Sequence, residues 1–273
     1  MGSLSGKVAL ITGAARGQGR SHALRLAQEG ADIIALDICR QLETVPYPMA
    51  TVEDLDETVV LVEKLDRRIF ARQADVRDPA AVAAVVDAGV AELGRLDIVL
   101  ANAGISPHSA DEKDALAVFH DTVAINLTGV RHTVHAAVPA IIAGGEGGSI
   151  VITSSTQGLT GRGGTGTGAG DGYVASKHAV VGLMRSWANW LAPHRIRVNT
   201  VHPTGVSTPM ILNDAMAGFL ALSPDIAGAL TNLLPVEAVE AIDISNAIAW
   251  LVSDQARYVT GVTLPVDAGF VVK

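Results

Sequence analysis

Tyr173 and Lys177 are the residues whose types and spacing most directly suggest chemistry. They are four positions apart in the stretch 173–191, which the sequence predicts as a long helix, so both side chains leave the same face. A free tyrosine has a pKa of about 10, too high for a general base at neutral pH, but a neighbouring ammonium group favours the phenolate. The pair predicts proton transfer at a substrate oxygen, with an ordinary surface pair as the alternative.

A serine hydroxyl at the end of the apolar run 148–153 is the second chemical candidate. Ser154 or Ser155 could hydrogen-bond a substrate oxygen and stabilise the charge that develops on it. Serines at strand ends are otherwise turn residues or helix caps, so each has a structural alternative.

A glycine-rich loop, 12–19, joins a predicted strand at 7–12 to a predicted helix at 21–28. Gly13, Gly17 and Gly19 would let the backbone turn tightly and approach a pyrophosphate at the helix N-terminus. Arg16 and Gln18 lie within this loop and are expected cofactor contacts. Arg16 is either a phosphate contact or a solvated loop charge.

Asp37 closes the next predicted strand, 33–36, about 20 residues after the glycine loop. A carboxylate there accepts hydrogen bonds from the ribose 2′-OH of NAD and repels the 2′-phosphate of NADP. Asp37 and the following Ile38 are therefore expected to bind NAD, whereas a basic Arg16 argues for a phosphate. The structural alternative for Asp37 is a helix or turn cap.

Alternating strands and helices predict the fold class. Further strands are expected at 68–71, 97–100, 148–153, 195–199 and 261–266, with a helix at 80–92 and a flexible Gly- and Thr-rich loop at 161–172. This alternation indicates an α/β Rossmann fold, a doubly wound parallel sheet with helices on both faces, over one domain, 1–273.

Composition limits the partners. The chain has 20 Lys and Arg against 28 Asp and Glu, a net charge of -8 without a basic run, which disfavours nucleic acid. No apolar run is long enough to span a bilayer, and no signal peptide is apparent. The single cysteine, Cys39, fits packing in a reducing cytoplasm. The eight histidines show no spacing that predicts a metal site.

These motifs, in this order, resemble the short-chain dehydrogenase/reductase family, classical branch, over essentially the whole chain. The resemblance rests on Thr-Gly-x-x-x-Gly-x-Gly at 12–19, Asp75-Val76, Asn102-Ala103-Gly104, Asn126, Ser155, the Tyr173–Lys177 pair and the segment 199–208.

The resemblance implies a role for each matching residue. Tyr173 would be the general acid or base, Ser155 would bind the substrate oxygen, Lys177 would also hold the nicotinamide ribose, and Asn126 would hold a water that links Lys177 to solvent. Further cofactor contacts would be Asp75, Val76, Asn102, Ala103, Gly104, Pro203, Val206 and Thr208. The nicotinamide segment departs from the family pattern, because Pro203-Thr204-Gly205 replaces Pro-Gly. Asn126 could alternatively satisfy backbone groups only.

A closer resemblance is to the carveol dehydrogenase-like, mycofactocin-associated subfamily. It rests on an inserted segment at about 40–66, which includes Pro46-Tyr47-Pro48, and on 71–78 and 202–204. It implies oxidation of a lipophilic, cyclic or terpenoid secondary alcohol with tightly held NAD, and a redox partner that reoxidises the cofactor. It also implies a homotetramer, to which the apolar run 260–272 is suited as an interface.

The apolar segment at about 209–242 is expected to form a lid over a small lipophilic alcohol or ketone, as in the family. Alternatively, its side chains pack against the core or a neighbouring subunit. Two rival functions are an NADPH-dependent ketone or acyl-chain reductase, which Asp37 disfavours, and a non-catalytic nucleotide-binding sensor. A sensor would not need the polar set of Asn126, Ser155, Tyr173 and Lys177.

Overall fold

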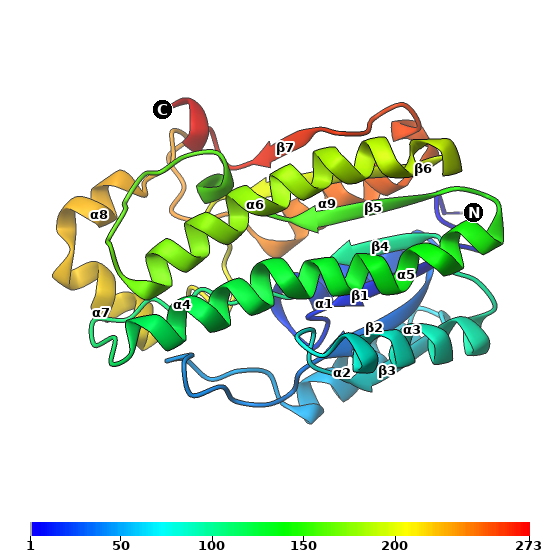
Figure 1. Cartoon of the computed structure of the whole chain (residues 1–273), viewed down its shortest axis with the longest axis horizontal. Coiled ribbons are helices and arrows are strands. Elements are labelled where there is room, and N and C mark those ends of the chain that lie inside the picture. The colour runs from blue at the N-terminus through cyan, green and yellow to red at the C-terminus, as the bar shows by residue number, and fades with distance from the viewer. Residues whose placement is uncertain (1) are drawn as a thin grey trace.

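A seven-stranded parallel sheet forms the centre of the computed structural model, which describes residues 2–273 (Figure 1). The strands are β1 (Val8–Thr12), β2 (Asp32–Asp37), β3 (Ile69–Gln73), β4 (Ile98–Ala101), β5 (Gly148–Thr153), β6 (Ile196–Pro203) and β7 (Thr263–Val266). Their spatial order is β3-β2-β1-β4-β5-β6-β7, so the strand order reverses between β1 and β4. The predicted doubly wound parallel sheet is confirmed, and the reversal marks where a Rossmann sheet binds its ligand.

Helices cover both faces of the sheet. They are α1 (Gly17–Gln28), α2 (Val52–Glu63), α3 (Pro79–Leu93), α4 (Ala115–Val123), α5 (Val130–Gly144), α6 (Gly168–Leu191), α7 (Asp214–Leu222), α8 (Pro224–Ala229) and α9 (Ala241–Val252). Leu10 of β1 packs in a core with α3, α5 and α6, whereas Ala9 and Ile11 pack in a second core with α1, α2 and α9. Alternate strand residues thus enter opposite cores, which explains the nearly continuous apolar strands.

The helix α2 was not predicted, although it lies within the segment 40–66. Thr51 caps it: its hydroxyl accepts the Asp54 N–H, and the Asp54 carboxylate accepts the Thr51 N–H. This reciprocal capping box is readable in the sequence as Thr-x-x-Asp. The residues between β2 and Thr51 form an extended loop, and we call residues 39–50 of it the strap.

The helix α6 begins at Gly168, so the prediction of a flexible loop was wrong for 168–172. Its glycines allow a close approach to α4, since a Cβ at Gly168 would lie 1.8 Å from the Ala115 carbonyl oxygen. The Glu112 carboxylate accepts the N–H groups of Gly168 and Ala169, both at 2.8 Å, and so caps the helix. The glycines that suggested a loop are therefore a packing requirement.

A π-helix, Ala124–Gly129, joins α4 to α5 and carries Asn126. Such wide turns are rare and occur often at functional sites. At the carboxyl ends of the strands, α7 and α8 project beyond the sheet, at the left of Figure 1. In the part of the chain that the structure covers, no helix combines the length and apolar character needed to cross a bilayer.

Asp97 ties the amino ends of β4 and β1 together. Its buried carboxylate accepts the Val8 N–H at 2.9 Å and two hydrogen bonds from the Arg95 guanidinium at 2.8 and 2.6 Å. Because Arg95 is 42% exposed, the buried Val8 donor sets most of the cost of losing the carboxylate.

We expect Asp97→Ala to lower the free energy of unfolding by about 1–3 kcal/mol, because it leaves the Val8 N–H buried without an acceptor. Urea unfolding followed by circular dichroism measures this loss. Asp87→Ala, on the exposed face of α3, is the matched control. Equal stability of the two variants would contradict the role of Asp97 in joining the amino ends of β1 and β4.

Candidate active site

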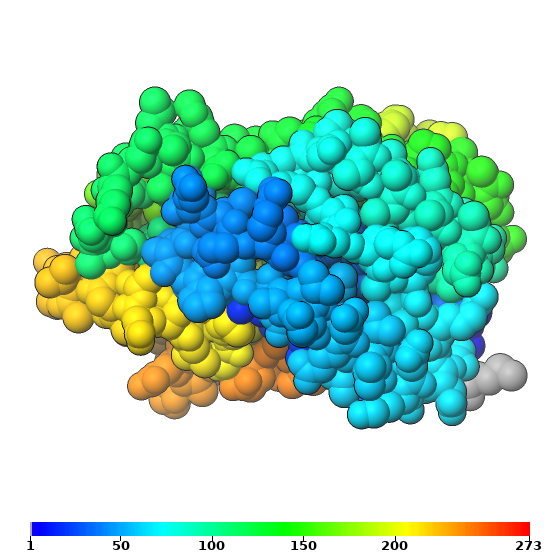
Figure 2. Space-filling view, turned by 90° about the horizontal axis from the view of Figure 1, so that it is seen from below, coloured from blue at the N-terminus to red at the C-terminus, as the bar shows by residue number. Residues whose placement is uncertain are grey.

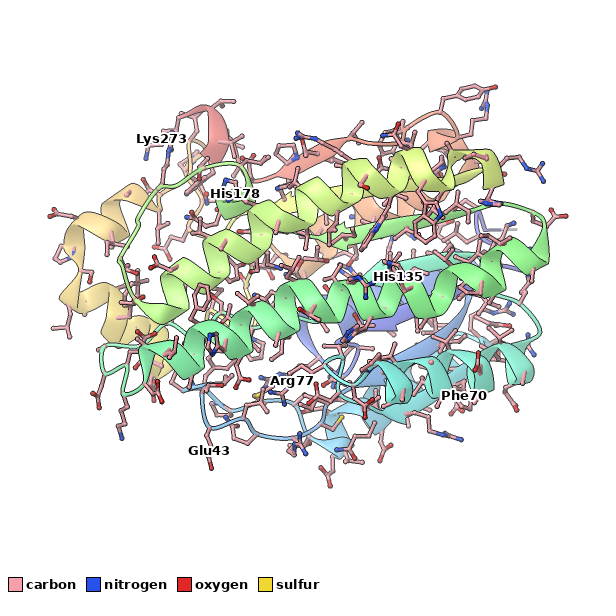
Figure 3. All side chains as sticks on the ribbon, viewed as in Figure 1. Glu43, Phe70, Arg77, His135, His178 and Lys273 are labelled. Atoms are coloured by element: carbon pink, nitrogen blue, oxygen red, sulfur yellow. The ribbon has the colours of Figure 1, made fainter. Side chains whose placement is uncertain are left out.

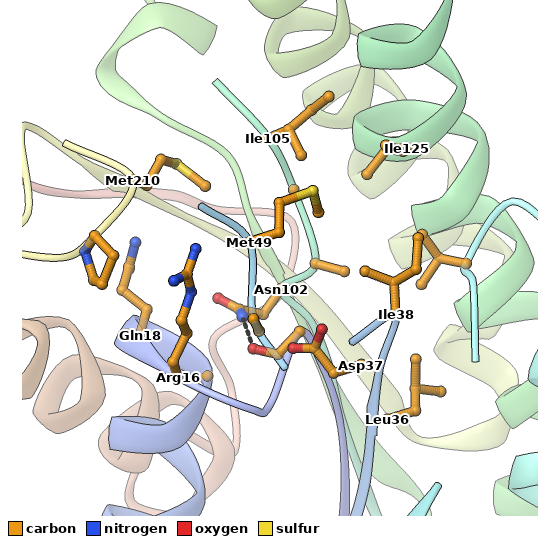
Figure 4. A pocket seen from close by; sticks show the side chains of 18 of the residues that line it. Arg16, Gln18, Leu36, Asp37, Ile38, Met49, Asn102, Ile105, Ile125 and Met210 are labelled. Carbon is orange, nitrogen blue, oxygen red and sulfur yellow. Dashed lines mark hydrogen bonds between the residues drawn. The ribbon is translucent and has the colours of Figure 1, made fainter. Parts of the chain in front are cut away.

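A cavity opens at the carboxyl ends of β1, β2 and β4, and we call it the glycine-loop cavity (Figure 4). Its lining includes thirteen of the predicted cofactor-binding residues: Gly13, Arg16, Gly17, Gln18, Gly19, Asp37, Ile38, Asp75, Val76, Asn102, Ala103, Gly104 and Thr208. The structure therefore brings together most of a set that is dispersed along the sequence.

The glycine loop has the shape that close backbone approach requires. Gly13 and Gly17 have positive φ angles of 68° and 55°. A Cβ at Gly19 would lie 1.9 Å from the Gly13 carbonyl oxygen, so only glycine fits there. Gln18 adds a buried side-chain oxygen that has no hydrogen-bond partner in the structure. The glycine loop leaves room for a pyrophosphate, and the free oxygen of Gln18 could accept a hydrogen bond from a hydroxyl group of a bound nucleotide.

Asp37 joins the end of β2 to the glycine loop. Its carboxylate accepts the Ala15 N–H at 3.0 Å and the Cys39 N–H at 3.2 Å, so the expected capping contacts are present while the side chain also lines the cavity. Burial raises the pKa of Asp37, and these backbone hydrogen bonds and Arg16 act in the opposite direction. Burial and the neighbouring Asp37 raise the pKa of the Cys39 thiol to about 12, which fits a packing role.

Asp75 lies across the cavity from the glycine loop. Its carboxylate forms an ion pair with Arg77 at 2.7 Å. Burial raises the pKa of Asp75, but the Arg77 hydrogen bonds outweigh it, and the pKa is lowered overall. Arg77 also pairs with Asp121 of α4 at 2.8 Å, and Asp121 accepts the Thr44 hydroxyl at 2.7 Å. Figure 3 shows Arg77 between α4 and the strap that carries Glu43.

The strap forms a further wall of the glycine-loop cavity, which the sequence did not predict. Tyr47 and Met49 line the cavity from the strap, and Met210 lines it from the opposite side. The Arg16 guanidinium donates one hydrogen bond to the Pro48 carbonyl, a contact that the sequence did not predict, and Arg16 also lines the cavity. Figure 2 shows the blue strap surface beside the yellow surface of residues near 210. The sequence signal that could have indicated this wall is Pro46-Tyr47-Pro48, an aromatic residue between two prolines.

A second, larger cavity of about 1210 Å³ lies under α7 and α8, and we call it the lid cavity. Ser155 and Tyr173 form part of its wall. Apolar side chains that line it include Phe119, Met216, Phe219, Leu220, Ile226, Leu230 and Phe270. The arrangement places two hydroxyl groups at the edge of a largely apolar space.

Lys177 is buried and Tyr173 is half-buried, so the surface-pair alternative is wrong. Lys177 Nζ lies 5.5 Å from the centre of the Tyr173 ring and donates to the Thr153 carbonyl at 2.8 Å. Burial lowers the pKa of Lys177 to about 8. Burial also raises the pKa of Tyr173, which only the hydrogen bond with Ser155 opposes. Burial therefore outweighs Lys177 at this tyrosine, and the expected lowering of its pKa depends on the positive nicotinamide as well as on the ammonium group.

The structure separates the two candidate serines. Ser154 donates its hydroxyl hydrogen to the Lys177 carbonyl at 2.8 Å, whereas Ser155 lines the lid cavity. Buried His202 lies 2.7 Å from the Ser155 carbonyl through Nδ1 and 2.8 Å from the Thr200 hydroxyl through Nε2. This contact, which the sequence did not predict, holds the turn that presents Ser155. The geometry favours Ser155 as the substrate contact.

Asn126 makes two hydrogen bonds of 2.8 Å with the backbone of Ile105, one in each direction. Asn126 therefore satisfies backbone groups, as one of the two predicted roles required. A Cβ at Gly104 would lie 3.1 Å from Asn126 Oδ1 and 3.6 Å from Lys177 Nζ. These two side chains consequently flank the same glycine, beneath the floor of the glycine-loop cavity.

Three predicted cofactor residues, Lys177, Pro203 and Val206, line neither cavity. Pro203 ends β6, and buried Val206 pairs with Val239 in an isolated parallel bridge. This turn delivers Thr208 to the glycine loop, where a Cβ at Gly17 would lie 3.5 Å from the Thr208 side chain. Within residues 2–273, no group of three or more His, Cys, Asp or Glu side chains is arranged to hold a metal ion.

Fold and site together define a Rossmann protein built for a nucleotide and a second, apolar ligand. A family profile described as enoyl-(acyl carrier protein) reductase matches residues 13–271. The (-)-trans-carveol dehydrogenase of Rhodococcus erythropolis is 50% identical over 286 residues, which cover 100% of both chains. The chain belongs to the short-chain dehydrogenase/reductase family, as predicted.

Solved structures agree with this assignment. The carveol dehydrogenase of Mycobacterium avium in complex with NAD is 53% identical, with a TM-score of 0.91 and coverage of 100% of both chains. A short-chain dehydrogenase of Mycobacterium paratuberculosis bound to NAD is 47% identical, with a TM-score of 0.93 over 100% of both chains. The predicted resemblance to carveol dehydrogenases is confirmed.

The lowered pKa of Lys177 predicts a pH-dependent stability. The unfolded lysine keeps its proton up to about pH 10.5, whereas the folded one releases it above about pH 8. The unfolded state then binds more protons in this window, so wild-type stability should rise with pH by about 3 kcal/mol relative to Lys177→Met.

Urea unfolding of both proteins between pH 7 and about pH 10.5 tests this difference. Lys113→Met, at an exposed lysine, is the matched control and should show no such drift. A constant difference between wild type and Lys177→Met would contradict a desolvated Lys177.

Proposed function

We propose that this protein is an NAD-dependent dehydrogenase that oxidises a lipophilic secondary alcohol to a ketone, with Tyr173 as the general acid/base. The observation that carries the proposal is the position of Tyr173 and Ser155 on the wall of the apolar lid cavity, with Lys177 buried behind them. The glycine-loop cavity supplies the neighbouring place for a cofactor. The reverse reaction uses the same groups.

A bound NAD would supply the hydride acceptor for the alcohol carbon, and its positive nicotinamide would favour the Tyr173 phenolate. Tyr173 takes the hydroxyl proton as the alcohol is oxidised. Ser155 hydrogen-bonds the same oxygen and stabilises the developing charge. Lys177 and Asn126, which flank Gly104, would pass the proton to solvent through a water held at Asn126.

The choice of NAD rests on Asp37, whose buried carboxylate lines the cavity at the end of β2. A carboxylate there accepts the ribose 2′-OH and repels a 2′-phosphate, which argues against the NADPH-dependent ketone or acyl-chain reductase. Arg16 is the opposing argument, but one of its donors already binds the Pro48 carbonyl, whereas Asp37 stands directly where the ribose hydroxyl is expected. A non-catalytic sensor would not need the arrangement of Tyr173, Ser155 and Lys177, which argues against that alternative.

We further propose that NAD is held tightly. The strap closes one side of the glycine-loop cavity through Tyr47 and Met49, and its contacts to Arg16 and Asp121 fasten it at two points. A cofactor retained in this way needs a separate redox partner for reoxidation. A link to mycofactocin is part of this proposal.

The substrate would be a cyclic or terpenoid alcohol. The apolar lining of the lid cavity supports this class, with 209–242 acting as the lid. Pro203-Thr204-Gly205 has a role in this arrangement, because the Thr204 hydroxyl donates to Asn232 of the lid segment at 2.7 Å. The lid and the segment 40–66 would be parts of one domain, 1–273.

We also propose a cytoplasmic homotetramer. Large apolar side chains remain exposed on the outer faces of the helices and near the C-terminal run, among them Trp190, Trp250 and Tyr258 at 44%, 41% and 88%. Burial between copies would remove this surface from water. The buried, unpaired Cys39 fits a reducing compartment.

Tyr173→Phe should retain its nucleotide but lose turnover by a factor of about 10²–10⁴, because only the proton-transfer group is removed. Oxidation of carveol with an artificial electron acceptor, together with added NAD, measures the loss. Tyr258→Phe, at a tyrosine that lines neither cavity, is the matched control. Substantial turnover by Tyr173→Phe would remove Tyr173 from the mechanism.

Arg16→Ala should release bound nucleotide roughly tenfold faster, because it removes one hydrogen bond that fastens the strap. The fraction of protein that retains nucleotide during timed dialysis, read by absorbance after denaturation, measures this. Arg185→Ala, at an exposed arginine of α6, is the control. Unchanged retention would show that the strap does not limit exchange.

A further inference from the structure

His108 lies between the strap and the reacting end of the lid cavity. Its ring centre is 6.1 Å from that of Tyr173, in a T-shaped arrangement, and 5.2 Å from that of Phe219 on α7. It also lines the lid cavity. His108 therefore stands within reach of any molecule that contacts both Tyr173 and the lid.

The orientation of the His108 ring is fixed from the strap side. Nδ1 lies 3.1 Å from the Ser106 hydroxyl, and the Ser106 N–H donates to the hydroxyl of Tyr47 at 3.2 Å. Tyr47 is itself buried on the strap. No hydrogen bond engages Nε2 among residues 2–273, so this nitrogen is available to a ligand in the cavity.

The ring offers a hydrogen bond rather than a charge. Burial lowers the pKa of His108, against the weaker opposing effect of Glu112, so the imidazole is neutral at neutral pH. The neighbouring walls contributed by Phe119 and Phe219 are apolar. A neutral, oriented polar group in an apolar wall can discriminate between ligands that do and do not carry a matching oxygen.

We propose that His108 is a specificity-determining residue that binds a second oxygen of the substrate, and that Tyr47 is the positioning residue that holds it. The ring centres of His108 and Tyr173 are 6.1 Å apart, so one small molecule can reach both, and the proposal places the second oxygen on a carbon at or near the one next to the oxidised carbon. The substrate class is thus a lipophilic vicinal diol or hydroxyketone. This inference rests on the proposed function for the location of the reacting oxygen.

Binding of two probe alcohols tests the proposal without turnover. The protein is saturated with NADH, with which an alcohol cannot react, and is titrated calorimetrically with cyclohexanol and with trans-cyclohexane-1,2-diol. The ratio of the two dissociation constants in each variant removes the difference in hydration between the probes. Wild type is compared with His108→Phe, His108→Gln and Tyr47→Phe.

We expect His108→Phe to shift this ratio roughly three- to tenfold toward cyclohexanol, the effect of one neutral hydrogen bond. His108→Gln, which keeps a donor and an acceptor, should retain the wild-type ratio. Tyr47→Phe should shift the ratio in the same direction by a smaller factor, because Ser106 loses its acceptor. His194→Phe, at an exposed histidine that lines neither cavity, should keep the ratio and is the matched control.

An unchanged ratio in His108→Phe, or failure of wild type to bind either alcohol, would overturn the inference. The proposed function fails separately. If wild type binds the diol through His108 but never oxidises it, the binding role stands and the dehydrogenase assignment falls.

Discussion

Burial of a lysine ammonium group beneath the carboxyl edge of the sheet is the constraint around which this site is built. Lys177 is only 4% exposed, and among residues 2–273 its Nζ has one hydrogen-bond acceptor, the Thr153 carbonyl at the end of β5. Burial disfavours the charged form of the lysine, and it therefore lowers the pKa of Lys177 to about 8. The group is tolerated because α6, β5 and the π-helix enclose it with little freedom to rearrange.

The surrounding glycines follow from this enclosure. A Cβ at Gly158 would lie 2.5 Å from the Lys177 carbonyl oxygen, and one at Gly168 would overlap α4. Close approach of α6 to its neighbours places Tyr173 at the cavity wall and Lys177 one turn below it. The same helix thus sets both the packing and the chemistry of the site.

Other buried polar groups form hydrogen bonds that join neighbouring elements around the site. Burial lowers the pKa of His202 to about 4 and that of His22 to about 3, so both rings are neutral and serve as hydrogen-bonding struts. His202 supports the Ser155 turn, and His22 Nδ1 lies 2.8 Å from the Ser245 hydroxyl, which joins α1 to α9. Asp37 similarly joins β2 to the glycine loop. The two histidines are neutral and Asp37 accepts two backbone hydrogen bonds, so these contacts fix the elements without leaving an unpaired buried charge.

The sequence predicted the sheet, the glycine loop and Asp37 because those features depend on local patterns, whereas Asp75, Val76 and 102–104 were expected from the family resemblance. Apolar runs, a glycine spacing and a carboxylate at a strand end are all readable over a few residues. The start of α6 was missed because its glycines serve contacts with α4 that are distant in sequence. The strap, the His108 contacts and the raised pKa of Tyr173 depend on burial and on residues brought together only by the fold.

The most direct measurement identifies the nucleotide that the protein selects. Purified protein is incubated with an equimolar mixture of NAD and NADP, dialysed and denatured, and the released nucleotide is identified and quantified by mass spectrometry. The account predicts NAD in nearly equal amount to protein, because Asp37 accepts the ribose hydroxyl and the strap closes over the cavity. Release of NADP, or of no nucleotide, would contradict it.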